Sequence, residues 1–262
     1  MTDFKINGLV IQEKEIGDND KLLTVLSERY GKLFVIGKGV KSIKNRHMHC
    51  CHLLSYVSFN LRRKGNYYYI TESDLLENFF EVRNDLTKLS LASYVCDIVN
   101  HLAWEGTTED SLLRLTLNTL FAISKEKQPL ELIRAAFQMK ALAEAGMYPD
   151  LSACSACESE EIVGGYLDLV DGVIICNNCK NKLNLIETSA SFVERGLDKP
   201  IAIITKGVID AIKFIVNSDS KRFLSFTLSD EECELFYILS EKFLINQLER
   251  GFNTLDFYKS IL

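Results

Sequence analysis

The first eighty residues alternate apolar and polar positions in short runs, and a period of two residues is typical of β-strands. Turn residues separate the runs, at GDND, around Tyr30 and Gly31, and at RRKGN. The runs are FKINGLVIQEKEI, KLLTVLS, KLFVIGKGV, LLSYVSFNL and YYYITESDLL. Five short strands in about 75 residues predict a small closed barrel or sandwich, and the five-stranded OB-fold is one candidate.

Beyond Phe80 the apolar residues recur every three or four positions, which is the spacing of amphipathic helices. The first such segment, DLTKLSLASYVCDIVNHLAWE, has apolar residues at Leu86, Leu89, Val95, Ile98 and Leu102. Further helical segments are TTEDSLLRLTLNTLFAISKEK, PLELIRAAFQMKALAEAG, TKGVIDAIKFIVNS and SDEECELFYILSEKFLINQLERG. The chain is therefore predicted to be an α+β protein with two domains. A β domain covers residues 1–80, and a mostly helical domain covers residues 81–262, with an interruption at about 150–185.

Residues that favour helix ends mark the bounds of these segments. Thr107 or Thr108 is the expected N-cap of the second helix. Pro129 suits the first turn of the third helix, and Gly146 closes it. Ser229, followed three residues later by a glutamate, gives the last helix the spacing of a capping box.

Four of the eight cysteines form two C-x2-C pairs inside the interruption, with eighteen residues between the pairs. They are Cys154, Cys157, Cys176 and Cys179. A two-residue gap lets one tight turn present two thiolates, and two such turns complete the tetrahedral shell that zinc prefers. The intervening ESEEIVGGYLDLVDGVII has two short apolar pieces, as in a zinc-ribbon hairpin. We expect one structural zinc ion per chain at these cysteines; the alternatives are unrelated thiols or a redox pair.

The charge is unevenly distributed along the chain, although the net charge is −6. Residues 1–80 carry twelve Lys and Arg against nine Asp and Glu, and residues 29–64 have nine basic residues and no acidic one. Such asymmetry indicates contact with nucleic acid or another polyanion, although a charge run can also be an ordinary solvated surface. The residues expected to face DNA are Lys32, Lys38, Lys41, Lys44, Arg46, Arg62, Arg63 and Lys64.

Aromatic residues near these cations could stack on bases, because binding of single strands without sequence preference combines a basic groove with aromatic faces. The candidates are Phe34, Tyr56, Phe59, Tyr67, Tyr68 and Tyr69. For each of them the simpler interpretation is a place in the barrel core.

The stretch RHMHCCH, residues 46–52, contains three of the four histidines and two cysteines. These residue types are common zinc ligands, but their spacing here is dense, and adjacent cysteines could hardly both enter one tetrahedral site. We interpret the stretch as the edge of a DNA-binding surface, to which protonated histidines would add charge at lower pH. Metal binding stays open for His47, His49, Cys50, Cys51 and His52.

The N-terminal segment MTDFKING lacks the basic start and apolar run of a secretory leader, and the apolar runs elsewhere are too short for a membrane span. A cytoplasmic protein without membrane contact is therefore expected. In that reducing compartment, eight cysteines indicate metal binding or buried thiols before disulfides.

Four segments together carry a family resemblance. LVIQEKEIGDNDKLLTVLSERYGKLFVIGKGVKSIKNR combines an acidic glycine turn, a Gly-Lys step and a Lys-Gly-x-basic loop. IRAAFQMKALAEAGMYPDLSACSAC joins a helix to the first cysteine pair, with Met147 before Tyr148 where the pattern has Gly-Tyr-x-Pro. GVIICNNC and FLINQLERGFNTLDFYKSIL complete the set. In order and spacing these segments resemble the bacterial recombination-mediator RecO family over nearly the whole chain, although HMHCCH is outside the family pattern.

The resemblance implies an N-terminal OB-fold, a helical C-terminal domain and a zinc-binding insertion. It implies binding and annealing of single- and double-stranded DNA, and contact with RecR and with the tail of single-stranded-DNA-binding protein. RecA and RecF would be indirect partners, at the nucleoid in the cytoplasm. By position, Lys38, Lys41, Lys44 and Arg46 would face DNA, and Lys32 corresponds less closely.

Several functions compete at this point. The first is a non-enzymatic mediator of DNA repair and recombination in the RecF pathway. A regulator that binds nucleic acid through a zinc ribbon and OB-fold, without mediator activity, is the alternative. A zinc hydrolase or deaminase is not expected, because catalytic zinc usually keeps three protein ligands and a water. The chain also lacks P-loop, G-x-S-x-G and H-E-x-x-H motifs. A ribbon that itself binds phosphates is disfavoured by Glu158, Glu160, Glu161, Asp168 and Asp171.

Overall fold

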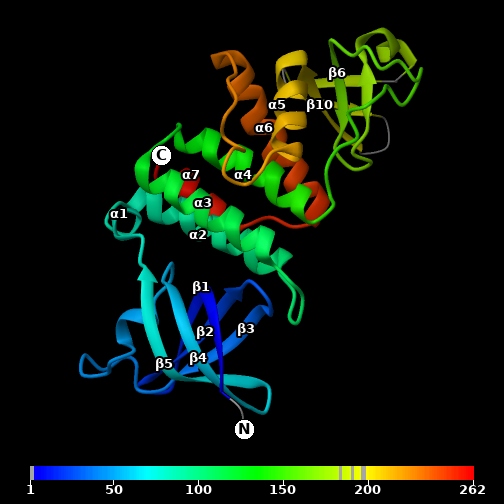
Figure 1. The fold of residues 1–262 in the computed structure, drawn as a ribbon. Coiled ribbons are helices and arrows are strands. Elements are labelled where there is room, and N and C mark those ends of the chain that lie inside the picture. Colours follow the sequence, from blue (N-terminus) through cyan, green and yellow to red (C-terminus); the bar gives the residue numbers. More distant parts are fainter. Residues whose placement is uncertain (1–2, 183–184, 190–191, 196–198) are drawn as a thin grey trace. The chain divides into compact units, whose positions relative to one another are not determined.

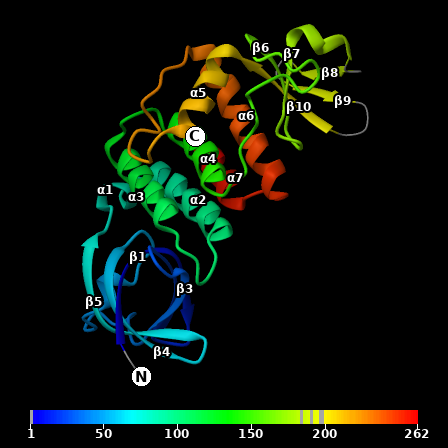
Figure 2. The same ribbon diagram turned by 45° about the vertical axis from the view of Figure 1, so that its right-hand side comes forward.

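The computed structural model describes residues 3–182, 185–189, 192–195 and 199–262. The chain divides into two compact units. The first comprises the chain up to Lys127 together with Phe252–Leu262, and the second comprises Gln128–Gly251. Figure 1 and Figure 2 show the elements of both units from two directions.

A closed barrel of five strands forms the N-terminal part of the first unit, coloured blue to cyan in Figure 1. Its strands are β1 (Asp3–Ile16), β2 (Asp20–Ser27), β3 (Gly31–Gly37), β4 (Tyr56–Lys64) and β5 (Tyr67–Glu77). The order around the barrel is β1-β2-β3-β5-β4, and the β3–β5 pair is parallel. The predicted five strands and closed barrel are confirmed, and the barrel is an OB-fold.

The barrel closes through a short contact between β3 and β5. Their register pairs Val35 with Tyr68 and Ile36 with Tyr69. Strand β3 begins four residues before this register, at Gly31. Residues 31–34 therefore precede the point at which β5 joins the sheet.

Alternate side chains of the strands fill the barrel interior. Val25, Val35, Phe59 and Leu61 are fully buried. Cys51, from the loop between β3 and β4, belongs to the same cluster. The two-residue period of the sequence is thus the alternation between the barrel interior and its surface. Burial of this apolar area drives closure of the barrel.

Helices α2 (Leu86–Leu102), α3 (Asp110–Lys125) and α7 (Asn253–Ser260) complete the first unit, after the short helix α1 (Phe80–Arg83). The C-terminal segment packs on α2. The rings of Tyr94 and Phe252 have centroids 5.5 Å apart, and Thr254 Oγ1 donates to Asp97 Oδ2 at 2.9 Å. These contacts explain why the last residues of the chain fold with the first unit.

Helix α3 begins later than the sequence predicted. Its N-cap is Glu109, so neither Thr107 nor Thr108 caps it. Thr107 Oγ1 instead lies 3.0 Å from the carbonyl oxygen of Trp104 and 2.7 Å from Glu109 Oε1, and can donate its one proton to either. Thr107 thus lies in the loop before the helix, two residues before the N-cap.

Helices α4 (Leu130–Glu144), α5 (Lys206–Asn217) and α6 (Asp230–Leu248) lie side by side in the second unit, as both Figure 1 and Figure 2 show. Helix α4 is buried along most of its length, including Arg134, which is 2% exposed. The Arg134 guanidinium lies 2.7 Å from the Glu131 carboxylate and 3.1 Å from that of Glu241. A buried cation needs such partners, because an unpaired charge in the interior is costly.

The ends of these helices largely follow the sequence signals. Pro129 is the N-cap of α4, one position before the predicted first turn, and Gly146 follows its C-cap with a left-handed φ of +76°. The capping box of α6 is confirmed by reciprocal hydrogen bonds of 3.3 and 3.2 Å between Ser229 and Glu232. Thr205, the N-cap of α5, also donates to Glu232 Oε1 at 3.1 Å. One carboxylate thus joins the starts of two helices.

A second five-stranded sheet, of order β7-β6-β10-β9-β8, belongs to the second unit. Its strands are β6 (Gly164–Asp168), β7 (Ile174–Cys176), β8 (Leu185–Ser189), β9 (Phe192–Arg195) and β10 (Lys199–Thr205). The β structure thus extends to Thr205, beyond the interruption at 150–185 that the helical spacing indicated. The reason lies in β10, whose short apolar run KPIAIIT has no clear period of either kind.

The capping box predicts a measurable loss of stability for Ser229→Ala. The variant removes the hydroxyl that accepts the Glu232 N–H, so the free energy of unfolding should fall by about 1 kcal/mol. Urea unfolding followed by circular dichroism measures this loss. Ser111→Ala, at an exposed position in α3, is the matched control and should cause no loss. Equal losses in the two variants would contradict the role of the cap.

Candidate metal centre and nucleic-acid interface

Two turns of the second unit bring four cysteines together. Cys154 and Cys157 lie in the turn before β6, Cys176 ends β7, and Cys179 lies in the 3-10 helix η2 (Asn177–Lys182). Their sulfur atoms all lie within 4.8 Å of one another, and those of Cys157 and Cys176 are 3.8 Å apart. Four soft donors at this separation match a closed tetrahedral metal site.

The local backbone explains how the two pairs meet. Glu158 N donates to Cys154 O at 2.8 Å, and Glu158 has a left-handed φ of +59°, so the first pair lies on a tight turn. On the hairpin, Gly165 lies opposite Cys176. A Cβ at Gly165 would come within 2.1 Å of the Ile175 carbonyl oxygen. Glycine therefore permits the close approach of β7 that brings Cys176 to the first pair.

Cys154 and Cys179 differ in how readily their thiols ionise, and a bound cation would stabilise both of them as thiolates. Burial opposes the Cys154 thiolate, but backbone N–H groups, that of Cys176 first, lower its pKa to about 6. Hydrogen bonds with neighbouring thiols, that of Cys157 first, and burial raise the pKa of Cys179 to about 12. A divalent cation stabilises thiolates directly, so these residues fit a bound metal ion.

The acidic residues of the ribbon do not all lie at its surface. Glu158, Glu160 and Glu161 are exposed, as expected. Asp168 is 1% exposed, and its carboxylate accepts hydrogen bonds of 3.0 Å from the N–H groups of Val170 and Asp171. The expectation that Asp168 adds to the acidic surface was therefore wrong, because its carboxylate shapes the turn between β6 and β7.

The outer side of the barrel carries a surface, termed the β5 face, on which basic and aromatic side chains meet. Directly opposed residues of antiparallel strands point to the same side of a sheet, and Arg62 is opposite Tyr69 while Lys64 is opposite Tyr67. The Lys38 ammonium lies 5.5 Å from the centre of the Tyr69 ring. Arg46 also reaches this strand, since its Nη2 donates to the carbonyl of Thr71 at 3.0 Å. The β5 face consists of Lys38, Arg46, Arg62, Lys64, Tyr67 and Tyr69.

Two of the cations expected to face DNA form exposed ion pairs. Arg62 makes hydrogen bonds of 2.7 and 2.8 Å with the Asp3 carboxylate, which lower the pKa of Asp3. Lys41 Nζ lies 2.7 Å from Glu15 Oε2 and lowers the pKa of Glu15 in the same way. Exposed pairs contribute little to stability, so their cations can exchange a carboxylate for a phosphate.

The remaining three cations differ in their surroundings. Lys32 Nζ donates to the carbonyl oxygen of Asn100 at 2.7 Å, near the end of α2. The Arg63 guanidinium lies 5.9 Å from the centre of the Tyr68 ring, and Tyr68 packs against the barrel core. Lys44 is exposed in the loop after β3. Lys32 and Arg63 therefore lie outside the β5 face.

The six aromatic candidates differ in how exposed their side chains are. Phe59 is fully buried in the barrel core, as the simpler interpretation expected. Tyr67 is 43% exposed. Phe34, Tyr56, Tyr68 and Tyr69 are half-buried. The exposure thus favours the tyrosines of β5 and Phe34 of β3 over Phe59 as partners for a base.

Residues 46–52 do not gather their side chains into one cluster. Cys50 and Cys51 belong to the barrel core, and burial raises the pKa of Cys51 to about 12. His47 Nδ1 instead lies 2.7 Å from Ser73 Oγ of β5. Among the residues that the structure describes, the four cysteines of the ribbon form the one group of three or more His, Cys, Asp or Glu side chains that could hold a metal ion.

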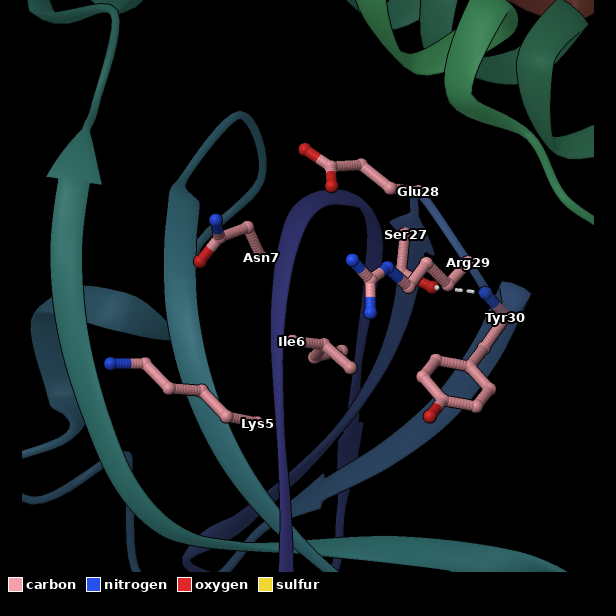
Figure 3. Close-up of a pocket in the computed structure, with 7 residues that line it drawn as sticks. All are labelled: Lys5, Ile6, Asn7, Ser27, Glu28, Arg29 and Tyr30. Carbon is pink, nitrogen blue, oxygen red and sulfur yellow. Dashed lines mark hydrogen bonds between the residues drawn. The ribbon is translucent and has the colours of Figure 1, made fainter.

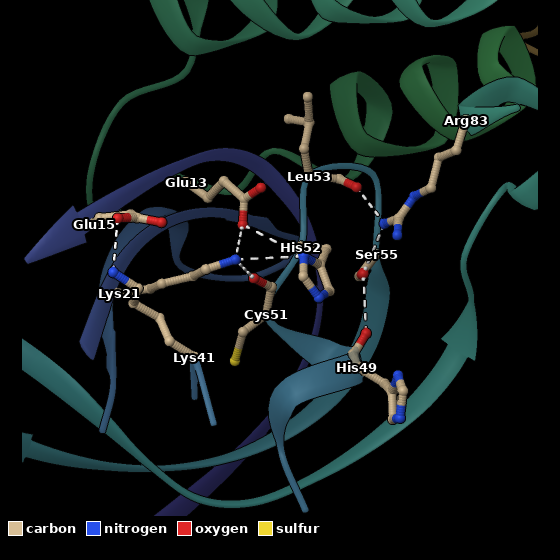
Figure 4. A network of polar contacts seen from close by, with 10 residues as sticks. All are labelled: Glu13, Glu15, Lys21, Lys41, His49, Cys51, His52, Leu53, Ser55 and Arg83. Carbon is tan, nitrogen blue, oxygen red and sulfur yellow. Dashed lines mark hydrogen bonds and ion pairs between the residues drawn. The ribbon is translucent and has the colours of Figure 1, made fainter. Parts of the chain in front are cut away.

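His52 belongs to a polar network at one end of the barrel, which Figure 4 shows and the sequence did not indicate. Lys21 is 8% exposed, and its ammonium lies 2.6 Å from Glu13 Oε2 and 3.3 Å from His52 Nδ1. The same ammonium donates to the carbonyl oxygen of Cys51 at 3.2 Å. The β1–β2 register places Lys21 opposite Glu15, and Glu13 lies two residues away on the same side of β1.

His47 and His52 contribute less positive charge than expected. Burial, followed by the neighbouring Arg46, lowers the pKa of His47. Burial, followed by Lys21, lowers the pKa of His52. Because both pKa values fall, these side chains become positive only at a lower pH than an ordinary histidine.

Two hollows that the sequence did not predict meet at Tyr30. The first has a volume of about 290 Å³, and Figure 3 shows the Lys5 side chain on one side of it and the Arg29 and Tyr30 side chains on the other. The second has a volume of about 330 Å³ and lies between β3 and the start of β5. Its lining includes Phe34 and Tyr68.

Comparison with known proteins accounts for nearly the whole chain. Residues 1–79 match the family described as recombination protein O N terminal, and residues 83–256 match recombination protein O C terminal. A DNA repair protein RecO of Acetivibrio thermocellus is 29% identical over the whole chain and 98% of its own length. Proteins of the same name from Thermoanaerobacter and Caldicellulosiruptor bescii are 26% and 27% identical. The alignments cover 98% and 83% of this chain, and 98% and 95% of those proteins.

The helices in the described residues were also compared with the length and hydropathy that a membrane span requires. None of these helices is both long enough and apolar enough to cross a bilayer.

The four-cysteine cluster predicts that the purified protein contains about one metal ion per chain. Elemental analysis measures the content. The double variant Cys154→Ser/Cys176→Ser should lose the metal, because it removes one thiolate from each turn. Cys233→Ser, a cysteine of α6 outside the cluster, is the matched control and should keep it. Metal retained in the double variant would move the site away from the ribbon.

Proposed function

This chain belongs to the RecO family of recombination proteins, and on that premise we propose that it is a non-enzymatic mediator of DNA repair in the RecF pathway. It binds and anneals DNA and helps RecA to load onto strands coated by single-stranded-DNA-binding protein. The observation that carries this proposal is the β5 face, where the Lys38 ammonium lies over the Tyr69 ring and Lys64 stands opposite Tyr67.

Such a surface suits a nucleic-acid strand because cations meet phosphates while aromatic rings accept bases. The loop after β3 adds the exposed charges of Lys41 and Lys44 to the β5 face. Lys41 and Arg62 can reach a phosphate by exchanging their carboxylate partners. These contacts do not depend on base identity, which is the property that annealing of arbitrary complementary strands requires.

The metal in this proposal is zinc, with a structural role. Four thiolate donors leave a tetrahedral ion no open position for water or substrate, so zinc held by Cys154, Cys157, Cys176 and Cys179 would stabilise the ribbon and perform no catalysis. The donor set therefore supports a protein that acts by binding.

The proposed protein partners are RecR and the C-terminal tail of single-stranded-DNA-binding protein, with RecA and RecF reached indirectly. Family membership supports these partners and a place at the nucleoid in the cytoplasm. In this proposal residues 1–80 bind DNA and residues 81–262 provide the helical domain. The alternative is a regulator that binds nucleic acid through the same β5 face and has no mediator activity.

The triple variant Lys38→Ala/Lys44→Ala/Arg46→Ala should weaken binding to single-stranded DNA. Each lost phosphate contact reduces the slope of log K against log salt by about 0.7, so the slope should fall by about 2. Fluorescence anisotropy with a labelled oligonucleotide at several salt concentrations measures this change.

The matched control is Lys206→Ala/Lys213→Ala/Lys221→Ala, which removes three exposed lysines from the second unit. Thermal melting should show both variants folded. Equal slopes in wild type and the first variant would place the phosphate contacts elsewhere.

Mediator activity predicts annealing of complementary strands that are already coated by single-stranded-DNA-binding protein. A strand-annealing assay with coated and naked strands measures it, and the triple variant Lys38→Ala/Lys44→Ala/Arg46→Ala should be slower on both. Annealing of naked strands alone would favour the regulator, because a generic binder cannot act on a strand that another protein covers.

A further inference from the structure

A second surface of the first unit, termed the Tyr30 groove, also combines aromatic rings with cations. It consists of the two hollows that meet at Tyr30, with volumes of about 330 and 290 Å³. Its rings are Tyr30, Phe34 and Tyr68, and its cations are Lys5, Arg29, Lys32 and Arg63. Two carboxylates, of Glu28 and Glu105, share its lining.

The groove exists because the pairing of β5 with β3 begins only at Val35, four residues after the start of β3. The parallel register begins at Val35, so residues 31–34 of β3 face the groove where β5 has not yet joined the sheet. Burial alternates along β3, with Leu33 buried and Lys32 and Phe34 half-buried. The Phe34 ring therefore lies outside the barrel core, on the lining of the groove.

The loop between α2 and α3 forms one wall. Lys32 N donates to Trp104 O at 3.0 Å, and Gly106 N donates to Tyr30 O at 3.1 Å. Gly31 has a φ of +61°, and a Cβ there would come within 2.1 Å of the Trp104 carbonyl oxygen, so glycine is required for this approach. Trp104 is the sole tryptophan of the chain and is 71% exposed.

Two of the three rings, those of Tyr30 and Tyr68, pack against Phe4 of β1. Phe4 contacts Tyr30 and Tyr68 edge to face, with centroids 5.2 and 5.4 Å apart. Tyr30 nevertheless remains 41% exposed. The Arg63 guanidinium lies 5.9 Å from the centre of the Tyr68 ring, so a positive charge lies beside the rings of the groove. Tyr30 and Tyr68 are thus held by Phe4 before any ligand arrives, which reduces the entropy lost on binding.

We propose that the Tyr30 groove is a stacking site for unpaired nucleobases of single-stranded DNA. The inference rests on the proposed DNA-binding function and names the form of DNA that this barrel selects. In a duplex the bases are stacked inside the helix, so their faces cannot reach Phe34 or Tyr30. In a single strand they can, and each stacked base should raise the affinity about fivefold or more.

The experiment compares two labelled strands with equal numbers of phosphates, oligo(dT) and an oligonucleotide of abasic sites. Wild type should bind oligo(dT) about fivefold or more tightly, and Phe34→Ala should reduce the difference while its affinity for the abasic strand stays unchanged. Emission of Trp104 should change with oligo(dT) and not with the abasic strand, because Trp104 directly precedes Glu105 and Gly106, which line the groove.

Two conservative variants separate stacking from folding. Phe34→Tyr keeps the ring and should keep the full preference for oligo(dT), while Phe34→Leu keeps an apolar side chain without a ring and should reduce the preference as Phe34→Ala does. Thermal melting identifies any variant that fails to fold.

Equal binding of the two strands by wild type would overturn the stacking site, and so would a preference that is undiminished in Phe34→Leu. If both strands bind equally with a steep salt dependence, the phosphate contacts of the β5 face stand and the groove fails. If neither strand binds, the proposed DNA-binding function fails as well.

Discussion

The late junction between β3 and β5 is the constraint on which the surfaces of the first unit depend. A parallel pair cannot be connected by a tight turn, so the chain must cross from β3 to β4 before β5 closes the barrel. That crossing carries the basic loop of residues 38–46 and places it beside β5, where Lys38 meets Tyr69. The same junction begins at Val35 and thereby leaves the start of β3 to line the Tyr30 groove. One topological requirement thus produces both the β5 face and the groove.

Buried charge holds this crossing in place. Lys21 donates to the carbonyl oxygen of Cys51, and Arg83 donates to that of Leu53, so cations from β2 and α1 fix successive parts of the loop (Figure 4). A buried ammonium is costly unless it is paired, and Glu13 provides the pair. The stretch RHMHCCH is therefore divided in its roles. Its cysteines fill the core, while His52 completes the network around Lys21.

Features set by local chemistry could be predicted from the sequence. The two-residue period gave five barrel strands, the Ser229–Glu232 spacing gave a capping box, and paired cysteines met in one cluster. Features set by tertiary contacts could not. Thr107 is a good N-cap by type, but its hydroxyl lies 3.0 Å from Trp104 O, in the loop before the helix. Asp168 looks like a surface acid, but the turn after β6 buries it. The Tyr30 groove depends on the register of β3 and β5, which no period in the sequence specifies.

In the proposed function, the carboxylates beside the basic surface would allow an acidic protein to bind DNA and still release it. Arg62 and Lys41 are partnered by Asp3 and Glu15 at exposed sites. A phosphate that binds there replaces a carboxylate, so the net gain is the difference between two similar contacts. Annealing needs such exchange, because a strand held too firmly cannot pair with its complement. The proposed stacking in the Tyr30 groove would also allow a strand to be released when it pairs with its complement. It favours bases that are still unpaired, and a base that enters a duplex withdraws its face from Phe34.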